Sequence, residues 1–202
     1  KAIPQIEHVV WLHPDPEYPA RLLSVLPESF RAPVEGIEIP NVDVREYVQM
    51  SSRRYDLIVL SIPDATTLTL NRYSTREFFE SLKNILANDG VVSLRISGGE
   101  NYMGGELAYL GASALVTLES LFAHAALKPG DESWLMGSDG NTLTQAPAEL
   151  RNRFAAIPSA SALYPPDGLP SLYPLDRVGF QMTKYREAIK AAPGDVLLNT
   201  DQ

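Results

Sequence analysis

The sequence predicts one α/β domain with a doubly wound, mostly parallel sheet. Apolar runs of strand length alternate with amphipathic runs of helix length, the order that gives parallel strands joined by covering helices. The clearest strand, Tyr55–Ser61, has a continuously apolar centre, which is typical of a parallel strand covered on both faces. The chain has 202 residues and is 45% hydrophobic, which is enough for one packed core.

The N-terminal part of the chain predicts two strands and two helices. The strands are the β-branched runs Ile6–Leu12 and Val34–Ile39, the first of which lies between prolines. The helices are Pro19–Leu26, with its leucines on one face, and Asp43–Met50.

A helix and a further strand are predicted after the central strand. Ser74 and Glu77 have the spacing of a capping box, which predicts that a helix begins there. The segment Asn88–Gly90 is expected to end it, because glycine adopts the left-handed C-cap conformation without steric cost. Val91–Ile96 is the next predicted strand, and Gly104–Gly105 precedes the next helix.

A pair of strands is predicted to complete the sheet. They are Ala123–Lys128 and Ser133–Met136, joined by a turn that contains proline and glycine. A short helix is expected after them at Pro147–Phe154.

The composition changes near residue 158. Ser159–Pro174 is rich in proline, serine and tyrosine and is predicted to be an extended loop. Leu175–Lys190 has an amphipathic helical pattern, whose apolar face needs a partner surface. We therefore predict an α/β core over residues 1–157 and a C-terminal extension over residues 158–202.

Charge and composition exclude several classes of protein. The chain carries 17 Lys and Arg against 25 Asp and Glu, a formal net charge of -8, which disfavours binding to nucleic acid. It contains no cysteine, which excludes thiolate zinc sites and cysteine nucleophiles and fits a cytoplasmic location. No metal site is predicted, because His8, His13 and His124 lack the spacing of metal ligands. No run reaches the roughly 20 apolar residues of a membrane-spanning helix.

Three blocks of sequence carry a family resemblance. The first, Tyr55–Asp64, is a Tyr-Asp strand followed by a loop with an aspartate. The second, Tyr73–Phe79, ends in two phenylalanines, and the third is Asp89–Val92. Together they resemble the polyamine aminopropyltransferases, or spermidine synthases, and Val42–Tyr47 is similar to the Asp-Ala-Arg segment of that family. The resemblance implies the fold shared by spermidine synthases and S-adenosylmethionine-dependent methyltransferases.

Three further motifs resemble a bacterial subgroup in which such a domain is joined to multi-pass membrane segments. They are Glu100–Tyr102, Pro129–Asp131 and Asn199–Asp201. This resemblance implies that membrane segments of a parent chain are partners of a soluble, cytoplasmic domain. It also aligns Lys1 with the end of the helix after the family's glycine-rich turn. We therefore expect the first strand of the sheet to lie upstream of this chain.

A missing first strand predicts a gap in the sheet. The gap would separate the strand that ends at Leu12 from the strand that ends at Ser61. Either the two strands close up, or another chain pairs in the space between them. The sequence also leaves open the alternative of a homodimer that forms through an exposed sheet edge or through the C-terminal helix.

The loop after the central strand is where the resemblance places the chemistry. In the family, decarboxylated S-adenosylmethionine donates an aminopropyl group to an amine that acidic side chains orient and deprotonate. The activating aspartate aligns with Ser61, and serine is not a base near neutral pH without a partner. The second aspartate is retained as Asp64, which either binds a cation or only closes the turn after the strand. Arg95 replaces a polar glutamine, and its charge is expected to oppose polyamine binding.

The resemblance also implies a nucleoside site, with Asp43 near the adenine. In the family, the pattern Val-Glu-x-Asp-Pro supplies an acid that binds the ribose hydroxyls. Its counterpart here is Val10–Pro14, in which Trp11 replaces the Glu and His13 replaces the Asp. Tryptophan can stack on a base but cannot accept hydrogen bonds from hydroxyls as a carboxylate does. Asp15 is the substitute acid if the register shifts. The implied ligands are S-adenosylmethionine, its decarboxylated form and 5′-methylthioadenosine.

Two hypotheses about function follow from these residues. The substitutions at Trp11, His13, Ser61 and Arg95 favour a catalytically degraded spermidine-synthase-like domain. Such a domain would be a cytosolic binding or regulatory module of a larger membrane protein, with a polyamine or a nucleoside as its ligand. The alternative is an active aminopropyltransferase or methyltransferase whose glycine-rich loop lies upstream. An unrelated α/β domain is the third reading, and it implies no function.

Overall fold

The sheet is mixed, with every strand but one running in the same direction. The computed structural model describes residues 3–141, 143–193 and 197–201. Its four-stranded sheet has the order β1-β2-β4-β3 and is formed by β1 (Tyr55–Leu60), β2 (Leu86–Ser97), β3 (His124–Lys128) and β4 (Glu132–Ser138). β1 pairs in parallel with β2, and β4 pairs antiparallel with β2 and β3, so β4 alone opposes the others. The predicted α/β sheet and its terminal strand pair are confirmed.

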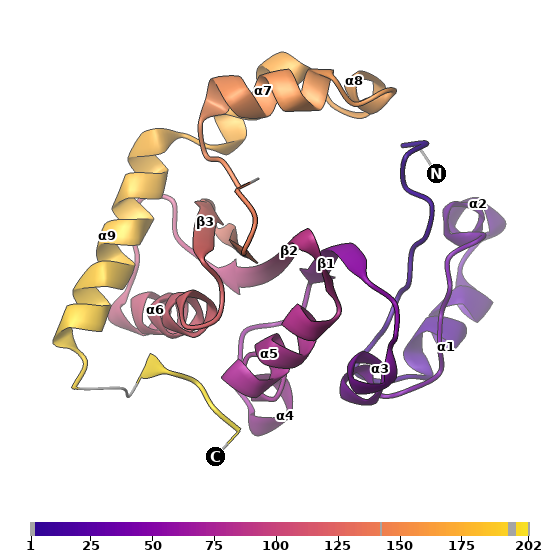
Figure 1. Cartoon of the computed structure of the whole chain (residues 1–202), viewed down its shortest axis with the longest axis horizontal. Helices are drawn as coiled ribbons and strands as arrows, with labels where there is room; N and C mark the ends of the chain where they lie inside the picture. Colours follow the sequence, from indigo (N-terminus) through magenta and orange to yellow (C-terminus); the bar gives the residue numbers. More distant parts are fainter. Residues whose placement is uncertain (1–2, 142, 194–196, 202) are drawn as a thin grey trace.

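Helices flank this sheet (Figure 1). The α-helices are α1 (Tyr18–Val25), α2 (Glu28–Arg31), α3 (Val44–Met50), α4 (Leu68–Asn71), α5 (Arg76–Asn84), α6 (Gly105–Glu119), α7 (Pro147–Ala155), α8 (Ala160–Leu163) and α9 (Leu175–Ala191), and the 3-10 helices are η1 (Ala32–Val34) and η2 (Pro166–Leu172). In Figure 1, α5 and α6 lie against one face of the sheet, α9 lies outside α6, and α1 to α3 lie beyond β1.

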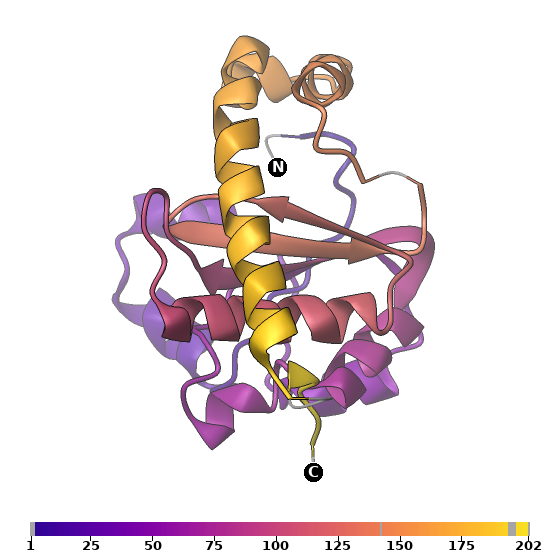
Figure 2. The same ribbon diagram turned by 90° about the vertical axis from the view of Figure 1, so that its left-hand side faces the viewer.

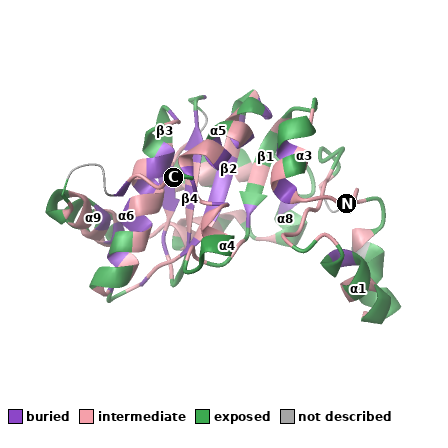
Figure 3. Ribbon diagram, turned by 90° about the horizontal axis from the view of Figure 1, so that it is seen from below, coloured by how far each residue is buried: buried purple, intermediate pink, exposed green. Residues whose placement is uncertain are grey.

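The core lies between the sheet and the helices α5 and α6. Val92 of β2 and Leu135 of β4 point into it and are completely buried. Phe79 of α5 and Leu118 of α6 meet them from the helical side and are buried as well. Buried residues run along these elements in Figure 3, whereas α1 is largely exposed.

The C-terminal helix α9 is fixed to the rest of the molecule by a buried glutamine. Gln181 accepts a hydrogen bond from the Ser133 hydroxyl at 2.9 Å and donates to the carbonyl oxygens of Gly99 and Gly130, each also at 2.9 Å. α9 runs across α6 in Figure 2. The predicted amphipathic helix is therefore confirmed, and its partner surface is α6. The domain boundary at residue 157 stays a prediction.

The two N-terminal strands that the sequence predicts do not form. The segments 6–12 and 34–39 are joined only by an isolated parallel bridge between Val10 and Glu38. A strand needs a ladder of backbone hydrogen bonds, and neither segment pairs with a strand of the sheet. No other strand of the described chain pairs with the outer edge of β1, so β1 is an edge strand. The predicted gap stays a prediction, because the strand at residues 6–12 that would border it does not form. Leu57 and Val59, which share one face of β1, are 58% and 52% exposed, so this face is not covered by another element.

The helix after β1 begins and ends differently from the prediction. Thr75, not Ser74, caps α5, because its hydroxyl accepts a hydrogen bond from the backbone N–H of Phe78. The helix ends at Asn84, and the segment 88–90 lies inside β2 rather than at a helix end. It forms an irregularity there, since the pairing with β1 jumps from Leu86 to Val91.

The segment 159–174 is not the extended loop that its composition predicts. It contains α8 and η2, and η2 packs against α7. Proline at the first position of η2 has its φ angle already set for a helical turn, which explains why this proline-rich segment folds into one.

Candidate functional site

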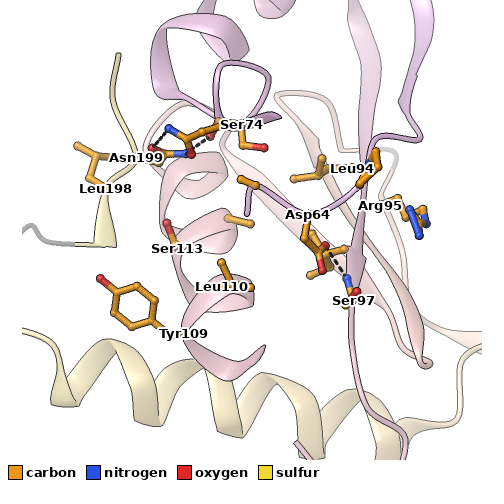
Figure 4. A pocket seen from close by; sticks show the side chains of 15 residues that line it. Asp64, Ser74, Leu94, Arg95, Ser97, Tyr109, Leu110, Ser113, Leu198 and Asn199 are labelled. Carbon is orange, nitrogen blue, oxygen red and sulfur yellow. Dashed lines mark hydrogen bonds between the residues drawn. The ribbon is translucent and has the colours of Figure 1, made fainter. Parts of the chain in front are cut away.

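A pocket of about 260 Å³ lies at the carboxyl ends of β1 and β2 (Figure 4). Open α/β sheets commonly bind ligands at this edge. Its walls come from the loop after β1, the end of β2, one face of α6 and the C-terminal residues. The lining residues are Pro63, Asp64, Ala65, Asn71, Ser74, Leu94, Arg95, Ile96, Ser97, Tyr109, Leu110, Ser113, Ala114, Leu198 and Asn199.

Asp64, a predicted site residue, lies in this pocket. One oxygen of its carboxylate accepts a hydrogen bond from the backbone N–H of Ser97 at 2.9 Å, which ties the loop after β1 to the end of β2. The side chain is half-buried. The carboxylate can therefore close the turn and still present negative charge to a ligand, so both roles that the sequence allows remain compatible with the geometry.

Arg95 does not bring an uncompensated positive charge to the pocket. Side chains alternate along β2, so Arg95 points to the opposite face of the sheet from the buried Leu94 and Ile96. Its guanidinium forms an ion pair with Glu132 on the neighbouring strand β4. The expected repulsion between Arg95 and a polyamine is thus countered by Glu132. Among the described residues, Asp64 is the charged side chain of the pocket lining that forms no ion pair.

The opposite wall of the pocket is built from neutral amides. The side chains of Asn71 and Asn199 exchange two hydrogen bonds of 2.8 and 3.2 Å, and the Asn199 amide also donates to the carbonyl oxygen of Ser74. Asn199 and Asp64 lie on opposite sides of the view in Figure 4. The pocket therefore has a charged end and a neutral polar end, with the apolar side chains of α6 and β2 between them.

Tyr185 of α9 packs against Gly111 of α6, and its hydroxyl is buried. Within the described chain the hydroxyl has no hydrogen-bond partner. Burial raises the pKa of Tyr185 to about 12, and the negative charge of Asp64 adds to the shift. The phenol is therefore neutral across the physiological range and cannot act as a general base.

Ser61, the other predicted catalytic position, lies outside the pocket lining. It follows β1 directly, and its side chain is exposed to solvent. Among the described residues, no side chain that could accept its proton is hydrogen-bonded to it. A serine without such a partner is not a nucleophile or a base near neutral pH.

The predicted nucleoside-binding residues are placed elsewhere. Asp43 caps α3 by accepting hydrogen bonds from the backbone N–H groups of Arg45 and Glu46, and it lies 3.4 Å from the guanidinium of Arg72. All of these contacts engage one oxygen of its carboxylate, Oδ1. Asp43 does not line the pocket that contains Asp64.

Trp11, His13 and Asp15 also lie away from the pocket, in the segment that precedes α1. His13 stacks on the ring of Tyr18 with the ring centroids 4.2 Å apart, and its Nδ1 lies 3.0 Å from the backbone nitrogen of Asp15. Asp15 is paired with Arg21 on α1. The structure thus brings Asp64 alone among the predicted site residues into the pocket.

Several pocket residues were not predicted as site residues. Asn71, Ser113 and Tyr109 belong to no motif, and sequence reasoning had no signal for them. Asn199 was part of the motif Asn199–Asp201, which was noted for its resemblance to a subgroup and not for a role in a site.

Other kinds of site are not found in the described residues. A second hollow of about 630 Å³ lies at the opposite end of the sheet, but its Lys83 is paired with Asp139 at 2.7 Å. No group of three or more potential metal ligands occurs in the ranges that the structure covers. None of the helices in those ranges is long and apolar enough to cross a membrane.

Comparison with known proteins supports the fold. No family model matches the chain. A segment of 61 residues is 30% identical to a polyamine aminopropyltransferase of Oceanobacillus iheyensis. This segment covers 30% of this chain and 12% of that protein.

Solved structures of spermidine synthases resemble this chain over most of its length. A spermidine synthase in complex with the transition-state analogue AdoDATO has a TM-score of 0.60 and 18% identity, over 89% of this chain and 64% of that one. The spermidine synthase of Thermotoga maritima has a TM-score of 0.56 and 17% identity, over 89% and 60% of the two chains. A probable spermidine synthase of Corynebacterium glutamicum has a TM-score of 0.51 and 19% identity, over 73% and 54%. The chain has the spermidine-synthase fold and spans less than two thirds of each of these proteins.

Proposed function

We propose that this chain is a spermidine-synthase-like domain that binds a small amine in the Asp64 pocket and does not transfer an aminopropyl group. One observation carries the proposal: the carboxylate that can hold a cation lies in the pocket, whereas Ser61 is exposed and lies outside its lining. Binding and chemistry are separate requirements, because an amine must be deprotonated before it can attack.

The charge of the pocket supports an amine as the ligand. Arg95 is paired with Glu132, so a bound ammonium group would meet the carboxylate of Asp64 without a competing cation. The walls of β2 and α6 between Asp64 and Asn199 are largely apolar and suit a hydrocarbon chain. The volume of about 260 Å³ lies just below the range of roughly 300–1,000 Å³ that is usual for drug-sized ligands, which favours a small amine.

A nucleoside ligand has less support from the geometry. A spermidine synthase of this fold was solved with AdoDATO, so an S-adenosylmethionine-related ligand is compatible with the fold. In this chain, however, Asp43 is engaged by backbone N–H groups and by Arg72, and Asp15 by Arg21. The alternative of an active aminopropyl- or methyltransferase needs both a nucleoside site and a base near residue 61.

Titration calorimetry and a transfer assay test this proposal together. The protein is titrated with putrescine, spermidine and 5′-methylthioadenosine, and the experiment is repeated with Asp64→Asn. Asp56→Asn is the matched control, because Asp56 is an exposed aspartate on β1 outside the pocket. We expect Asp64→Asn to weaken amine binding by about tenfold or more, equal to about 1.4 kcal/mol, and Asp56→Asn to leave it unchanged.

The transfer assay decides between the two hypotheses about function. We expect no 5′-methylthioadenosine to be released when the protein is incubated with decarboxylated S-adenosylmethionine and putrescine. Catalytic release of this product would establish the active transferase instead. An equal loss of amine binding in the Asp64 and Asp56 variants would show that the amine does not bind in the Asp64 pocket.

We propose further that the domain is a binding or regulatory module of a larger membrane protein in the cytoplasm. The support is the resemblance of Glu100–Tyr102, Pro129–Asp131 and Asn199–Asp201 to a subgroup with membrane segments. Expressing the natural gene at full length and fractionating the cells checks this. Recovery of the full-length protein in the soluble fraction after carbonate washing would contradict it.

A further inference from the structure

The last described residues of the chain form one wall of the Asp64 pocket. We name residues 197–201 the C-terminal strap. Leu198 and Asn199 of the strap line the pocket directly, on the side away from Asp64 (Figure 4). The strap is far from Asp64 in the sequence, and it reaches the pocket because other segments hold it there.

On one side the strap is held by α6. The hydroxyl of Ser113 donates to the carbonyl oxygen of Leu197 at 2.8 Å, and the backbone N–H of Asn199 donates to the hydroxyl of Thr117 at 3.2 Å. The side chain of Leu197 is only 3% exposed. Leu197 is thus the apolar anchor of the strap, and the residues after it are held mainly by polar contacts.

On the other side the strap is held by the start of α5. The carbonyl oxygen of Asn199 accepts a hydrogen bond from the backbone N–H of Arg76 at 2.8 Å. The backbone N–H of Asp201 donates to the Glu77 carboxylate at 2.9 Å. Because Arg76 is the first residue of α5, its N–H has no partner within the helix, and the strap satisfies it.

An ion pair closes the far end of the strap. Both terminal nitrogens of Arg45 on α3 donate to the carboxylate oxygens of Asp201, at 3.0 and 2.5 Å. The Arg45 side chain is 18% exposed, and its guanidinium lies 5.8 Å from the centroid of the Phe78 ring. A two-pronged bond from a partly buried arginine has fixed geometry and is stronger than a flexible surface pair.

These contacts can break without disturbing the core. Beyond Leu197 the strap has side chains of intermediate or high exposure, and its bonds go to side chains, to the carbonyl oxygen of Ser74 and to one free helix end. Segments with few buried apolar contacts belong to the parts of a protein that open locally at the lowest free energy. No strand of the described sheet pairs with the strap, so the sheet stays intact when it lifts.

We propose that the part of the C-terminal strap beyond Leu197 is a gate: when it lifts, it opens the Asp64 pocket on the side away from Asp64, and the pair Arg45–Asp201 is its latch. The identity of the ligand rests on the proposed function, whereas the gate rests on the contacts above. Modification of a thiol placed in the pocket tests the gate without any natural ligand, so the two proposals fail independently.

Because the chain contains no cysteine, an introduced thiol is the only group that a thiol-specific reagent modifies. Ala114→Cys places one thiol in the pocket lining, and its rate of modification by a cationic methanethiosulfonate reagent reports access. Asp201→Asn is added to release the latch. Glu119→Gln is the matched control, because Glu119 forms a similar two-pronged pair with Arg186 away from the pocket. Ala20→Cys on the exposed side of α1 gives the rate for an open thiol.

We expect the pocket thiol to react more slowly than the α1 thiol. Asp201→Asn should accelerate its modification about three- to tenfold, and Glu119→Gln should not. Hydrogen exchange at the Arg76 amide, which the strap covers, should accelerate in parallel, while exchange in β2 and β4 stays unchanged. A pocket thiol that reacts as fast as the α1 thiol would overturn the gate. The gate would also be overturned if both substitutions accelerated modification of the pocket thiol equally, or if hydrogen exchange accelerated throughout the sheet.

Discussion

The ring of Tyr185 on α9 lies directly against Gly111 on α6. A Cβ atom added at residue 111 would be 2.2 Å from Cε1 of that ring, a separation at which one of the two helices has to move. Glycine at this position is what allows α6 and α9 to pack with a completely buried tyrosine between them.

We therefore expect Gly111→Ala to destabilise the protein. Overpacking a closely packed contact typically costs about 1–3 kcal/mol, more than the fraction of a kcal/mol that alanine gains over glycine inside a helix. Gly179→Ala on α9 is the control, since a Cβ there meets nothing within 4 Å and should stabilise by up to about 1 kcal/mol. Urea unfolding of both variants measures the difference. Equal shifts in the same direction would mean that the two helices do not pack as described.

Removing the hydroxyl of Tyr185 should not cost stability. This hydroxyl is buried and has no partner in the described chain, so Tyr185→Phe removes an uncompensated polar group and should stabilise by about 1 kcal/mol. Tyr47→Phe is the comparison, because the hydroxyls of Tyr47 and Tyr55 are 2.7 Å apart and its removal should cost about 0.5–1.5 kcal/mol. Thermal unfolding of both variants is the measurement. A loss above 1 kcal/mol in Tyr185→Phe would reveal a bound partner for the hydroxyl.

The elements predicted correctly from the sequence are those whose pattern is local. Tyr55–Leu60 and Val91–Ile96 are apolar runs of strand length, and the apolar stripe of α9 matches the face that packs on α6. The runs Ile6–Leu12 and Val34–Ile39 have equally good strand composition. They fail because a strand also needs a neighbour in the sheet, and composition does not say whether one is present.

The site was predictable only in part for a similar reason. Asp64 lies in the short loop after β1, four residues beyond the last residue of the strand, so its place at the end of the sheet could be inferred from the sequence. The pairing of Arg95 with Glu132 depends on the register between β2 and β4, which the sequence does not specify, so the partner of Arg95 could not be predicted. Asn199 enters the pocket because the strap returns to α4 and α6, a path set by distant contacts.

The exposed face of β1 should tolerate charge. Leu57 is 58% exposed on the edge strand β1, so Leu57→Lys should change the free energy of unfolding by less than about 0.5 kcal/mol. Leu60→Ala on the same strand is the contrast, because Leu60 is only 6% exposed and its truncation should cost about 2–5 kcal/mol. Urea unfolding measures both. A large loss in Leu57→Lys would show that another segment or a second copy covers this face.

The latch of the strap should open in acid. The hydrogen bond from Arg45 is the largest of the effects that hold the pKa of Asp201 below its ordinary value, and a bond from Thr75 acts in the same direction. A carboxyl group whose pKa is lower in the folded state stabilises that state above its unfolded pKa, which is about 3.9. This contribution is lost as the pH falls through the lower, folded pKa. The strap should therefore be latched at neutral pH and released only in strong acid.

Nuclear magnetic resonance can follow this release at the strap itself. The carboxyl carbon of Asp201 and the backbone amide of Asn199 should titrate together, with a midpoint below about 3.9. In Arg45→Lys the midpoint should move upward, because one ammonium group cannot replace the two-pronged bond of the guanidinium. The carboxylates of Glu77 and Asp43 lie near the same end of the strap, so Asp201→Asn is needed to assign the transition. If the Asn199 amide keeps the same acid transition in Asp201→Asn, the latch is not Asp201.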